Sequence, residues 1–243
     1  MTTVLKLGGS VVTRKDEPET VDRPSLKRAA TAVSKADGEL VIVHGGGSFG
    51  HHHAADHGVS VTSGTHDAEA VRAIHGAMKR LNESVVSALA NVGSPAVPVH
   101  PLSCAARDGD GELSLSMTPV ETLLGEGFVP VLHGDVVAHA SKGSTILSGD
   151  ELVVSLAEAL DADRVGVCSA VPGVFDATGD VIDRITDFES VAAELGESDA
   201  TDVTGGMAGK VRSLLELDAA AFIFDIDGLA DFVTGENPGT KIG

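Results

Sequence analysis

Residues 44–51, His-Gly-Gly-Gly-Ser-Phe-Gly-His, contain the residue types in this chain best suited to binding phosphate. Four glycines in six positions leave backbone N–H groups uncovered, and the apolar run 40–43 before them is typical of a buried strand. A strand that ends in such a turn and continues into a helix forms an anion cradle. His51 closes the segment and adds a side-chain donor that could hold a second phosphate.

Two further glycine turns have lysines close to them. Residues 4–7 form an apolar segment interrupted by Lys6, and Gly8, Gly9 and Ser10 follow it. A lysine in a buried parallel strand is costly unless an anion or a carboxylate meets it near the strand end. Residues 202–210 again place glycines before an amphipathic helix, with a lysine in its first turns that opposes the helix dipole unless an anion offsets it. The three turns together favour phosphate chemistry.

Taken in order, these segments resemble the amino acid kinase superfamily, and within it the branch of archaeal isopentenyl phosphate kinases. The resemblance spans nearly the whole chain, because it rests on residues 6–10, Lys15, 44–51, 147–150 and 202–210. It implies an α/β fold, a three-layer αβα sandwich around a mostly parallel open sheet. It also implies ATP-dependent phosphorylation of isopentenyl phosphate to isopentenyl diphosphate in isoprenoid biosynthesis.

The resemblance assigns roles to individual residues. It places the phosphate of the acceptor at Gly46, His51 and Gly149, and it gives Lys15 the task of stabilising the transition state. Lys6 and Lys210 would balance the charge of ATP, with Mg²⁺ carried by the nucleotide. The residues implied in binding ATP are Lys6, Leu7, Gly8, Gly9, Ser10, Gly47, Ser169, Gly173, Gly206 and Lys210.

Three parts of the predicted site have alternatives when their residues are considered without the family resemblance. Asp150 could lie between lysines and keep them aimed, or it could be the N-cap of the helix that follows. Lys15 lies in a charged stretch that is typical of a solvated loop. Residues 169–175 lack the two acidic residues that the family usually carries near the base and ribose, which puts the nucleoside specificity in doubt.

Strand patterns alternate with helix patterns along the chain, and this order predicts a mostly parallel sheet covered on both faces. The predicted strands are 4–7, 40–43, 96–99, 129–132, 164–168 and 221–226. The predicted helices are 24–36, 66–91, 120–125, 151–160, 187–195 and 207–219. Residues 135–145 are interpreted as a hairpin excursion. Because no linker, repeat or low-complexity tract interrupts the pattern, we expect one domain over residues 1–243.

The predicted helix 66–91 carries apolar residues at helical spacing. Most of this stripe is interpreted as core packing. In the kinases that the chain resembles, part of the corresponding helix borders a pocket for an isoprenoid chain, so Ile74 and Met78 are hypothetical lining residues.

Composition restricts the possible partners. The chain has 36 acidic and 17 basic residues and a formal net charge of −19, which argues against nucleic acid or an anionic membrane as the main partner. The acidic residues are spread along the whole chain, a pattern that resembles proteins of halophilic archaea, with an ordinary acidic mesophilic enzyme as the alternative. The chain has no apolar run of membrane-spanning length and begins directly with a strand pattern, which predicts a cytoplasmic enzyme. Cys104 and Cys168 show neither the spacing of a disulfide framework nor that of a zinc site. The family resemblance implies a homodimer.

Other functions were weighed against the same residues. Gly45, Gly47 and Gly50 formally fit a dinucleotide fingerprint, but that interpretation leaves the lysines without a role. A Walker A loop is excluded at Lys210, since the flanking residues do not match. The histidines of 51–57 could suggest a metal, yet zinc sites need three or four converging ligands, so none is predicted. A sister kinase acting on another small phosphate or phosphonate, and a non-catalytic nucleotide-sensing domain, remain alternatives.

Overall fold

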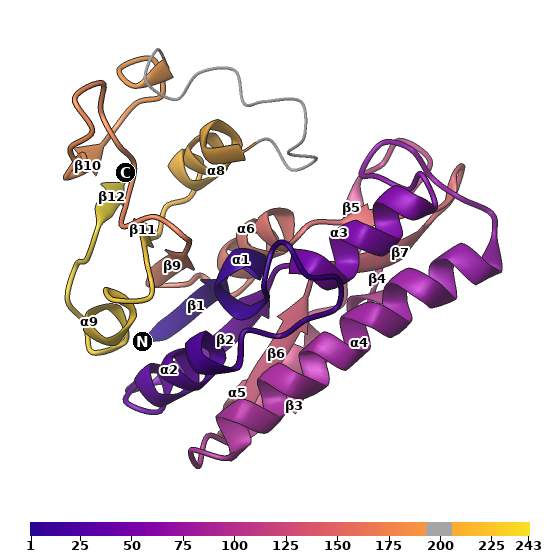
Figure 1. Ribbon diagram of the computed structural model, residues 1–243, viewed down its shortest axis with the longest axis horizontal. Helices are drawn as coiled ribbons and strands as arrows, with labels where there is room; N and C mark the ends of the chain where they lie inside the picture. The colour runs from indigo at the N-terminus through magenta and orange to yellow at the C-terminus, as the bar shows by residue number, and fades with distance from the viewer. Residues whose placement is uncertain (193–205) are drawn as a thin grey trace.

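The computed structural model describes residues 1–192 and 206–243, which form a large sheet, a small sheet and surrounding helices (Figure 1). The large sheet has eight strands in the order β10-β12-β11-β9-β1-β2-β6-β3. These strands are β1 Thr2–Leu7, β2 Glu39–His44, β3 Ala96–Pro98, β6 Val129–His133, β9 Arg164–Cys168, β10 Arg184–Ile185, β11 Ala220–Phe224 and β12 Thr240–Ile242. All of their pairings are parallel except that of β11 with β12. The mostly parallel sheet predicted from the sequence is therefore confirmed.

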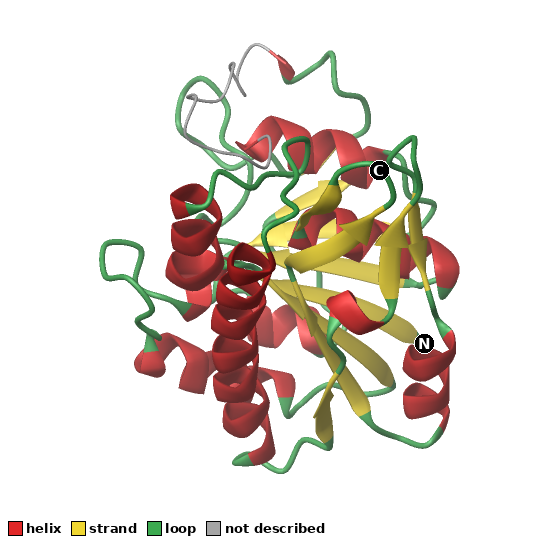
Figure 2. Cartoon of the chain, turned by 90° about the vertical axis from the view of Figure 1, so that its right-hand side faces the viewer, coloured by secondary structure: helices red, strands yellow, loops and turns green. Residues whose placement is uncertain are grey.

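Helices cover both faces of the large sheet (Figure 2). The helices are α1 Gly9–Val12, α2 Arg23–Val33, α3 Gly47–Asp56, α4 Ala68–Ala90, α5 Thr118–Gly125, α6 Gly149–Ala159, α8 Gly206–Leu215 and α9 Leu229–Val233, with a 3₁₀ turn η1 at Pro101–Ser103. Residues on α2, α4 and α9 pack on one face and those on α5, α6 and α8 on the other. The core is thus divided into two layers by the sheet, which gives the three-layer sandwich.

Alternation along β1 decides which layer each side chain enters. Val4 packs in the core beneath α6, whereas Leu5 and Leu7 pack beneath α2 and α4. Because successive side chains of a strand point to opposite faces, Lys6 shares the face of Val4 and is directed toward α6. β1 is also central, since it pairs with β2 on one side and β9 on the other. The buried central strand β1 therefore directs the side chain of Lys6 toward α6.

The excursion predicted at residues 135–145 is a hairpin that belongs to a second sheet. β7 Asp135–His139 pairs antiparallel with β8 Gly143–Leu147, as predicted. Two further strands, β4 Ala105–Arg107 and β5 Leu113–Leu115, complete a four-stranded sheet in the order β5-β4-β7-β8. This sheet leads directly into α6, so it positions the start of that helix.

Five of the six predicted helices agree with the structure in position and differ at their ends. α4 begins after Asp67, whose side chain accepts from Glu69 N, rather than at residue 66. α8 ends at Leu215, four residues early, because the chain must turn before β11 begins at Ala220. The helix predicted at 187–195 lies partly outside the described residues, and residues 187–191 form bends and turns instead.

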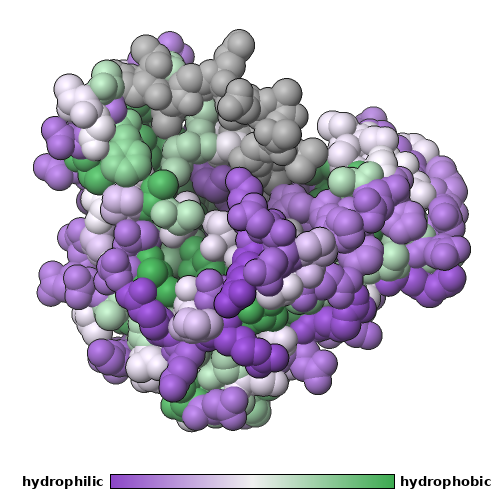
Figure 3. Space-filling view, in the orientation of Figure 1, coloured by the Kyte–Doolittle hydropathy of each residue, from purple (hydrophilic) through white to green (hydrophobic). Residues whose placement is uncertain are grey.

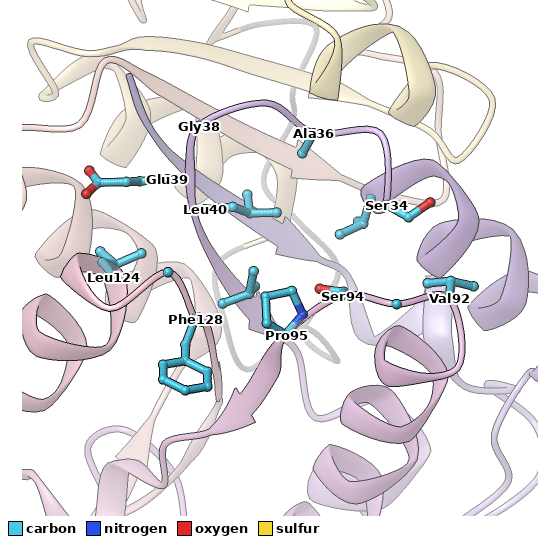
Figure 4. Close-up of a pocket in the computed structure, with 14 residues that line it drawn as sticks. Ser34, Ala36, Gly38, Glu39, Leu40, Val92, Ser94, Pro95, Leu124 and Phe128 are labelled. Atoms are coloured by element: carbon cyan, nitrogen blue, oxygen red, sulfur yellow. The ribbon is translucent and has the colours of Figure 1, made fainter.

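The outer surface adds two facts. Hydrophilic side chains dominate the face over α3 and α4 (Figure 3). A shallow pocket, which includes Leu40, Pro95 and Phe128, lies where β2, β3 and β6 begin (Figure 4). It is at the amino edge of the sheet, opposite the glycine turns.

Within the described residues, we find no helix with the length and apolar composition needed to cross a bilayer.

Candidate active site

Glycine turns from neighbouring strands meet at the carboxyl edge of the large sheet. Gly45 N, after β2, donates to Leu7 O at the end of β1 at 3.0 Å. Gly134 N, after β6, donates to His44 O at the end of β2, also at 3.0 Å. The turns are therefore joined by backbone hydrogen bonds into one surface, at the edge where ligands bind in open α/β sheets.

Close approach of the backbones requires glycine in these turns. A Cβ on Gly45 would lie 2.8 Å from Gly9 N, and one on Gly8 would lie 2.9 Å from Cys168 O. Gly47 has a φ of +48°, a left-handed conformation that suits glycine. In the first turn of α3, Ser48 N donates to the side-chain oxygen Thr13 Oγ1 at 3.0 Å, which joins this helix start to the end of α1. Helix starts of this kind are common anion sites.

Asp150 lies between two lysines that come from opposite ends of the chain. Lys6 Nζ is 2.6 Å from Asp150 Oδ1, and Lys210 Nζ is 3.9 Å from Asp150 Oδ2. The side chain of Lys6 is only 6% exposed, so solvent screens this contact weakly. The carboxylate that a lysine in β1 needs is thus supplied by α6, and a second lysine from α8 meets the same carboxylate.

The helix cap of α6 is another residue. Ser148 Oγ accepts from Glu151 N at 3.1 Å and has the extended backbone of an N-cap. The capping alternative for Asp150 is therefore wrong, and its carboxylate faces the lysines instead.

The three residues expected at the acceptor phosphate lie near the same edge. The ring carbon Cδ2 of His51 is 3.5 Å from the position that a Cβ on Gly46 would take. A Cβ on Gly149 would lie 3.4 Å from Lys6 Cε and 3.7 Å from Gly45 Cα. Gly149 also begins α6, so a second helix start faces this space. The structure therefore brings the turn after β2, His51, α6 and Lys6 together.

Two expected site residues are exposed, and one contributes only through its backbone. Ser10 lies on the exposed side of α1, and Lys15 lies in the exposed loop that follows it. Leu7 is 1% exposed, and its side chain packs in the core beneath α2 and α4. No contact joins Lys15 directly to Asp150 or Lys210 in the described part of the chain.

The expected nucleotide residues divide into two groups. Ser169 N donates to Phe224 O at 2.7 Å at the carboxyl edge, directly after the residue whose carbonyl binds Gly8. Gly173 is buried at the start of β12, where a Cβ would lie 2.6 Å from Thr240 Oγ1, and Thr240 pairs with Ile223 near the end of β11. Close packing against β12 thus accounts for that glycine. Gly206 starts α8 with a φ of +58°, and residues 202–205 of the third turn lie outside the described residues.

Sequence reasoning missed a buried network of histidines beneath the turns. His133 Nδ1 donates to Gly134 O at 2.9 Å, and its Nε2 accepts from His100 Nδ1 at 2.9 Å. The rings of His44 and His133 are stacked, with centroids 5.5 Å apart. The available signal was that a histidine followed by glycine ends both apolar runs 40–43 and 129–132.

The histidine network contacts α4 at two positions, His75 and Asn82. His44 Nε2 lies 3.1 Å from Asn82 Oδ1, and His44 Nδ1 lies 3.1 Å from Gly45 O. His75 Nδ1 donates to Asp135 Oδ2 at 2.8 Å. The network therefore links α4 to the turns after β2 and β6.

Burial keeps the inner histidines neutral. Desolvation lowers the pKa of His44 to about 4, and it lowers the pKa of His133 well below its ordinary value. Burial also raises the pKa of Asp135, although His75 opposes that shift. At neutral pH the rings of His44 and His133 are uncharged and each has one N–H, so His44 donates to one of Gly45 O and Asn82 Oδ1 and not to both at once.

With this geometry described, comparison with known proteins identifies the class. The sequence profile of the amino acid kinase family matches residues 1–220. The chain therefore belongs to the amino acid kinase family, and the fold class expected from the sequence is confirmed. The dinucleotide interpretation of the turn after β2 is accordingly set aside.

The branch within the family follows from individual relatives. An isopentenyl phosphate kinase of Haloferax volcanii is 65% identical over 241 residues, covering 98% of this chain and 97% of that protein. The isopentenyl phosphate kinase of Methanothermobacter thermautotrophicus is 37% identical over 233 residues, covering 88% and 86%. An X-ray structure of isopentenyl phosphate kinase superposes with a TM-score of 0.84 at 29% identity and full coverage of both chains. The chain thus groups with the isopentenyl phosphate kinases.

A pH dependence of stability follows from the neutral state of His44. Between pH 6.5 and about 4 the unfolded chain binds the proton that the folded chain excludes, so stability falls as the pH is lowered through this window. One such group contributes at most about 1.4 kcal/mol per pH unit. We expect His44→Gln to reduce the slope of unfolding free energy against pH, measured by urea unfolding at fixed KCl.

His57→Gln, at the exposed end of α3, is the matched control and should leave that slope unchanged. An unchanged slope in His44→Gln would contradict the neutral assignment.

Proposed function

We propose that this chain is an ATP-dependent kinase that phosphorylates isopentenyl phosphate to isopentenyl diphosphate, with residues 1–243 acting as one domain. The observation that carries the proposal is the placement of His51 and Gly46 beside Gly149 and Lys6. This is a second anion site next to the glycine cradle, so a donor phosphate and an acceptor phosphate can both be held. The names of the relatives agree with that substrate.

The residues at the carboxyl edge fit ATP. A Cβ on Gly9 would lie 2.3 Å from Gly47 N and one on Gly45 would lie 2.8 Å from Gly9 N, so glycine lets the turns after β1 and β2 lie against each other. The phosphates of ATP bind along these two turns, at the helix starts that follow them. Lys6 and Lys210 carry the positive charge needed beside a triphosphate. ATP supplies the phosphoryl group, and Mg²⁺ travels with the nucleotide as part of this proposal.

Phosphoryl transfer demands positioning and positive charge rather than covalent chemistry from the protein. Lys6 and Lys210 bind the donor phosphates, and Asp150 holds the two ammonium groups in place. Lys15, in the exposed loop after α1, stabilises the transition state. His51 donates a hydrogen bond to the phosphate of the acceptor, which arrives ionised, so no strong general base is required.

The nucleoside part of the site is proposed at the end of β9. Ser169 lies at the carboxyl edge and is retained as a nucleotide contact. Gly173 is retained only as a residue whose small size lets the loop pack on β12. The loop 169–175 has no acidic residue, so the preference between ATP and GTP has to be measured.

The tail of the acceptor is proposed to lie between α3 and α4. Met78 is buried, and its Sδ is 2.7 Å from where a Cβ on Gly50 would stand, next to His51. Ile74 packs in a small separate cluster with Val59 and Val136. Both residues lie on the α4 stripe predicted from the sequence, at the end nearest the acceptor phosphate.

The wider setting completes the proposal. We expect a homodimeric, cytoplasmic enzyme of the archaeal mevalonate route to isoprenoids. The net charge of −19 and the 65% identity to a Haloferax protein support function at high salt. Molar salt shortens the Debye length to about 3 Å and so screens the repulsion between surface carboxylates.

The first test is ADP release in molar KCl with MgATP and isopentenyl phosphate, with UMP, fosfomycin and acetylglutamate as competing acceptors. We expect turnover on isopentenyl phosphate, and a loss of about a hundredfold or more in kcat/KM in His51→Ala, since a charge-assisted contact to phosphate is removed. His57→Ala on the same helix is the matched control.

Turnover on another acceptor alone would move the function to a sister kinase. A folded protein that releases no ADP with any acceptor would favour a nucleotide-sensing domain instead.

A second prediction concerns the tail. Met78→Ala should increase turnover of longer prenyl monophosphates relative to isopentenyl phosphate, because it removes atoms beside Gly50. Leu89→Ala, a buried change at the far end of α4, serves as the control. Steady-state kinetics with a series of chain lengths measures the ratio, and an unchanged ratio in Met78→Ala would contradict the placement of the tail.

A further inference from the structure

The loop that carries Lys15 is closed at its base and exposed at its tip. An isolated antiparallel bridge pairs Thr13 with Val21, and Arg14 N donates to Thr20 O at 2.9 Å. Residues 14–18 form the exposed tip between these pairs, and Glu19 at its end is half-buried. Backbone pairing therefore fixes where the loop begins and ends, and another contact has to fix the tip.

Glu19 lies at the end of that tip in an unusual backbone conformation. Its φ is +49°, in the left-handed region that residues with a Cβ seldom adopt. Such a conformation costs on the order of 1 kcal/mol and persists where surrounding contacts hold it. Here Glu19 N donates to Ser48 O at 3.2 Å, on the first turn of α3. The backbone of Glu19 is thus hydrogen-bonded to α3, the helix that starts at the glycine turn after β2.

The carboxylate of Glu19 contacts two helices at once. Arg80 Nη2, on α4, lies 2.8 Å from both Glu19 Oε1 and Oε2. His53 Nε2, on α3, donates to Glu19 Oε1 at 2.5 Å. His53 and then Arg80 lower the pKa of the Glu19 carboxyl, so it remains ionised at neutral pH. One side chain therefore joins the loop to α3 and α4.

These contacts connect the two halves of the proposed site. Lys15 precedes Glu19 by four residues in the loop, and His51 precedes His53 by two residues on α3. A phosphoryl group passes in line between donor and acceptor, so a cation on a loop and a ligand on a helix must keep a fixed separation. The Glu19 carboxylate is one described link between the loop and α3, beside the contacts that Ser48 makes with Thr13 Oγ1, Glu19 N and Thr20 N.

We propose that Glu19 is a positioning residue that holds the Lys15 loop against α3 and α4 in the geometry needed for transfer. This inference rests on the role proposed for Lys15. Glu19 acts through Lys15 and touches neither substrate. Its removal affects the rate of transfer and leaves substrate binding largely intact.

The test compares Glu19→Gln with Lys15→Ala and with the double variant. Glu19→Gln should lower kcat about tenfold to a hundredfold, with the KM values for ATP and isopentenyl phosphate within about twofold. In the Lys15→Ala background, Glu19→Gln should lower kcat no further, because the residue it positions is gone. Glu17→Gln is the matched control, since it removes the Arg14–Glu17 pair from the same loop without touching a helix, and it should leave kcat unchanged.

A second variant separates the carboxylate from the backbone. Glu19→Gly retains a residue suited to a φ of +49° and removes the side chain, so it should lose kcat as Glu19→Gln does while its thermal midpoint stays close to that of the unchanged protein. Full kcat in Glu19→Gly would overturn the proposal. A further loss of kcat in the Lys15→Ala background would also overturn it, since Glu19 would then act by another route.

Failure of the underlying function gives a different result. If Lys15→Ala alone keeps full kcat, the role of Lys15 is wrong and the inference falls with it. If isopentenyl phosphate is not turned over by the unchanged protein, the proposed substrate is wrong.

Discussion

The contact on which the site depends is the carboxylate of Asp150 between the ammonium groups of Lys6 and Lys210. Strand alternation directs Lys6 from the central strand toward α6, where an isolated charge would be strongly disfavoured. Asp150 offsets that cost, and it also contacts Lys210 of α8, which lies more than 200 residues after Lys6 in the sequence. The pairing therefore brings β1, α6 and α8 together at the carboxyl edge of the sheet.

Around this contact the backbone turns provide shape and the histidines provide rigidity. Glycine turns approach until a Cβ would overlap the next backbone, so glycine is what lets the turns after β1 and β2 pack side by side at the carboxyl edge. Beneath them, neutral His44 and His133 bind the carbonyls of Gly45 and Gly134. A charged network would require more desolvation than the buried position allows, and neutral rings supply hydrogen bonds without that cost. The turns at the carboxyl edge are thus held in place from below, which is the preorganisation that the proposed phosphoryl transfer requires.

Local pattern predicted the large sheet, its parallel pairing and the glycine turns, because strand and turn signals act over a few residues. The position of Asp150 was one of two alternatives, and only the capping of α6 by Ser148 removed the other. Short strands such as β4, β5 and β12 were missed because three residues carry little periodicity. The hydrogen bonds between side chains of the histidine network, and those of Glu19 with His53 and Arg80, join residues 33 to 61 positions apart, and no local signal reports such pairs.

The most direct test of the central contact is steady-state kinetics of Asp150→Asn at saturating isopentenyl phosphate, with MgATP varied in molar KCl. Asparagine keeps the shape and removes the charge, so Lys6 and Lys210 would repel each other and lose their shared partner. The account predicts a fall in kcat/KM for ATP of about tenfold or more, with KM for isopentenyl phosphate little changed. Unchanged kcat/KM for ATP in a folded variant would contradict the claim that Asp150 organises the two lysines.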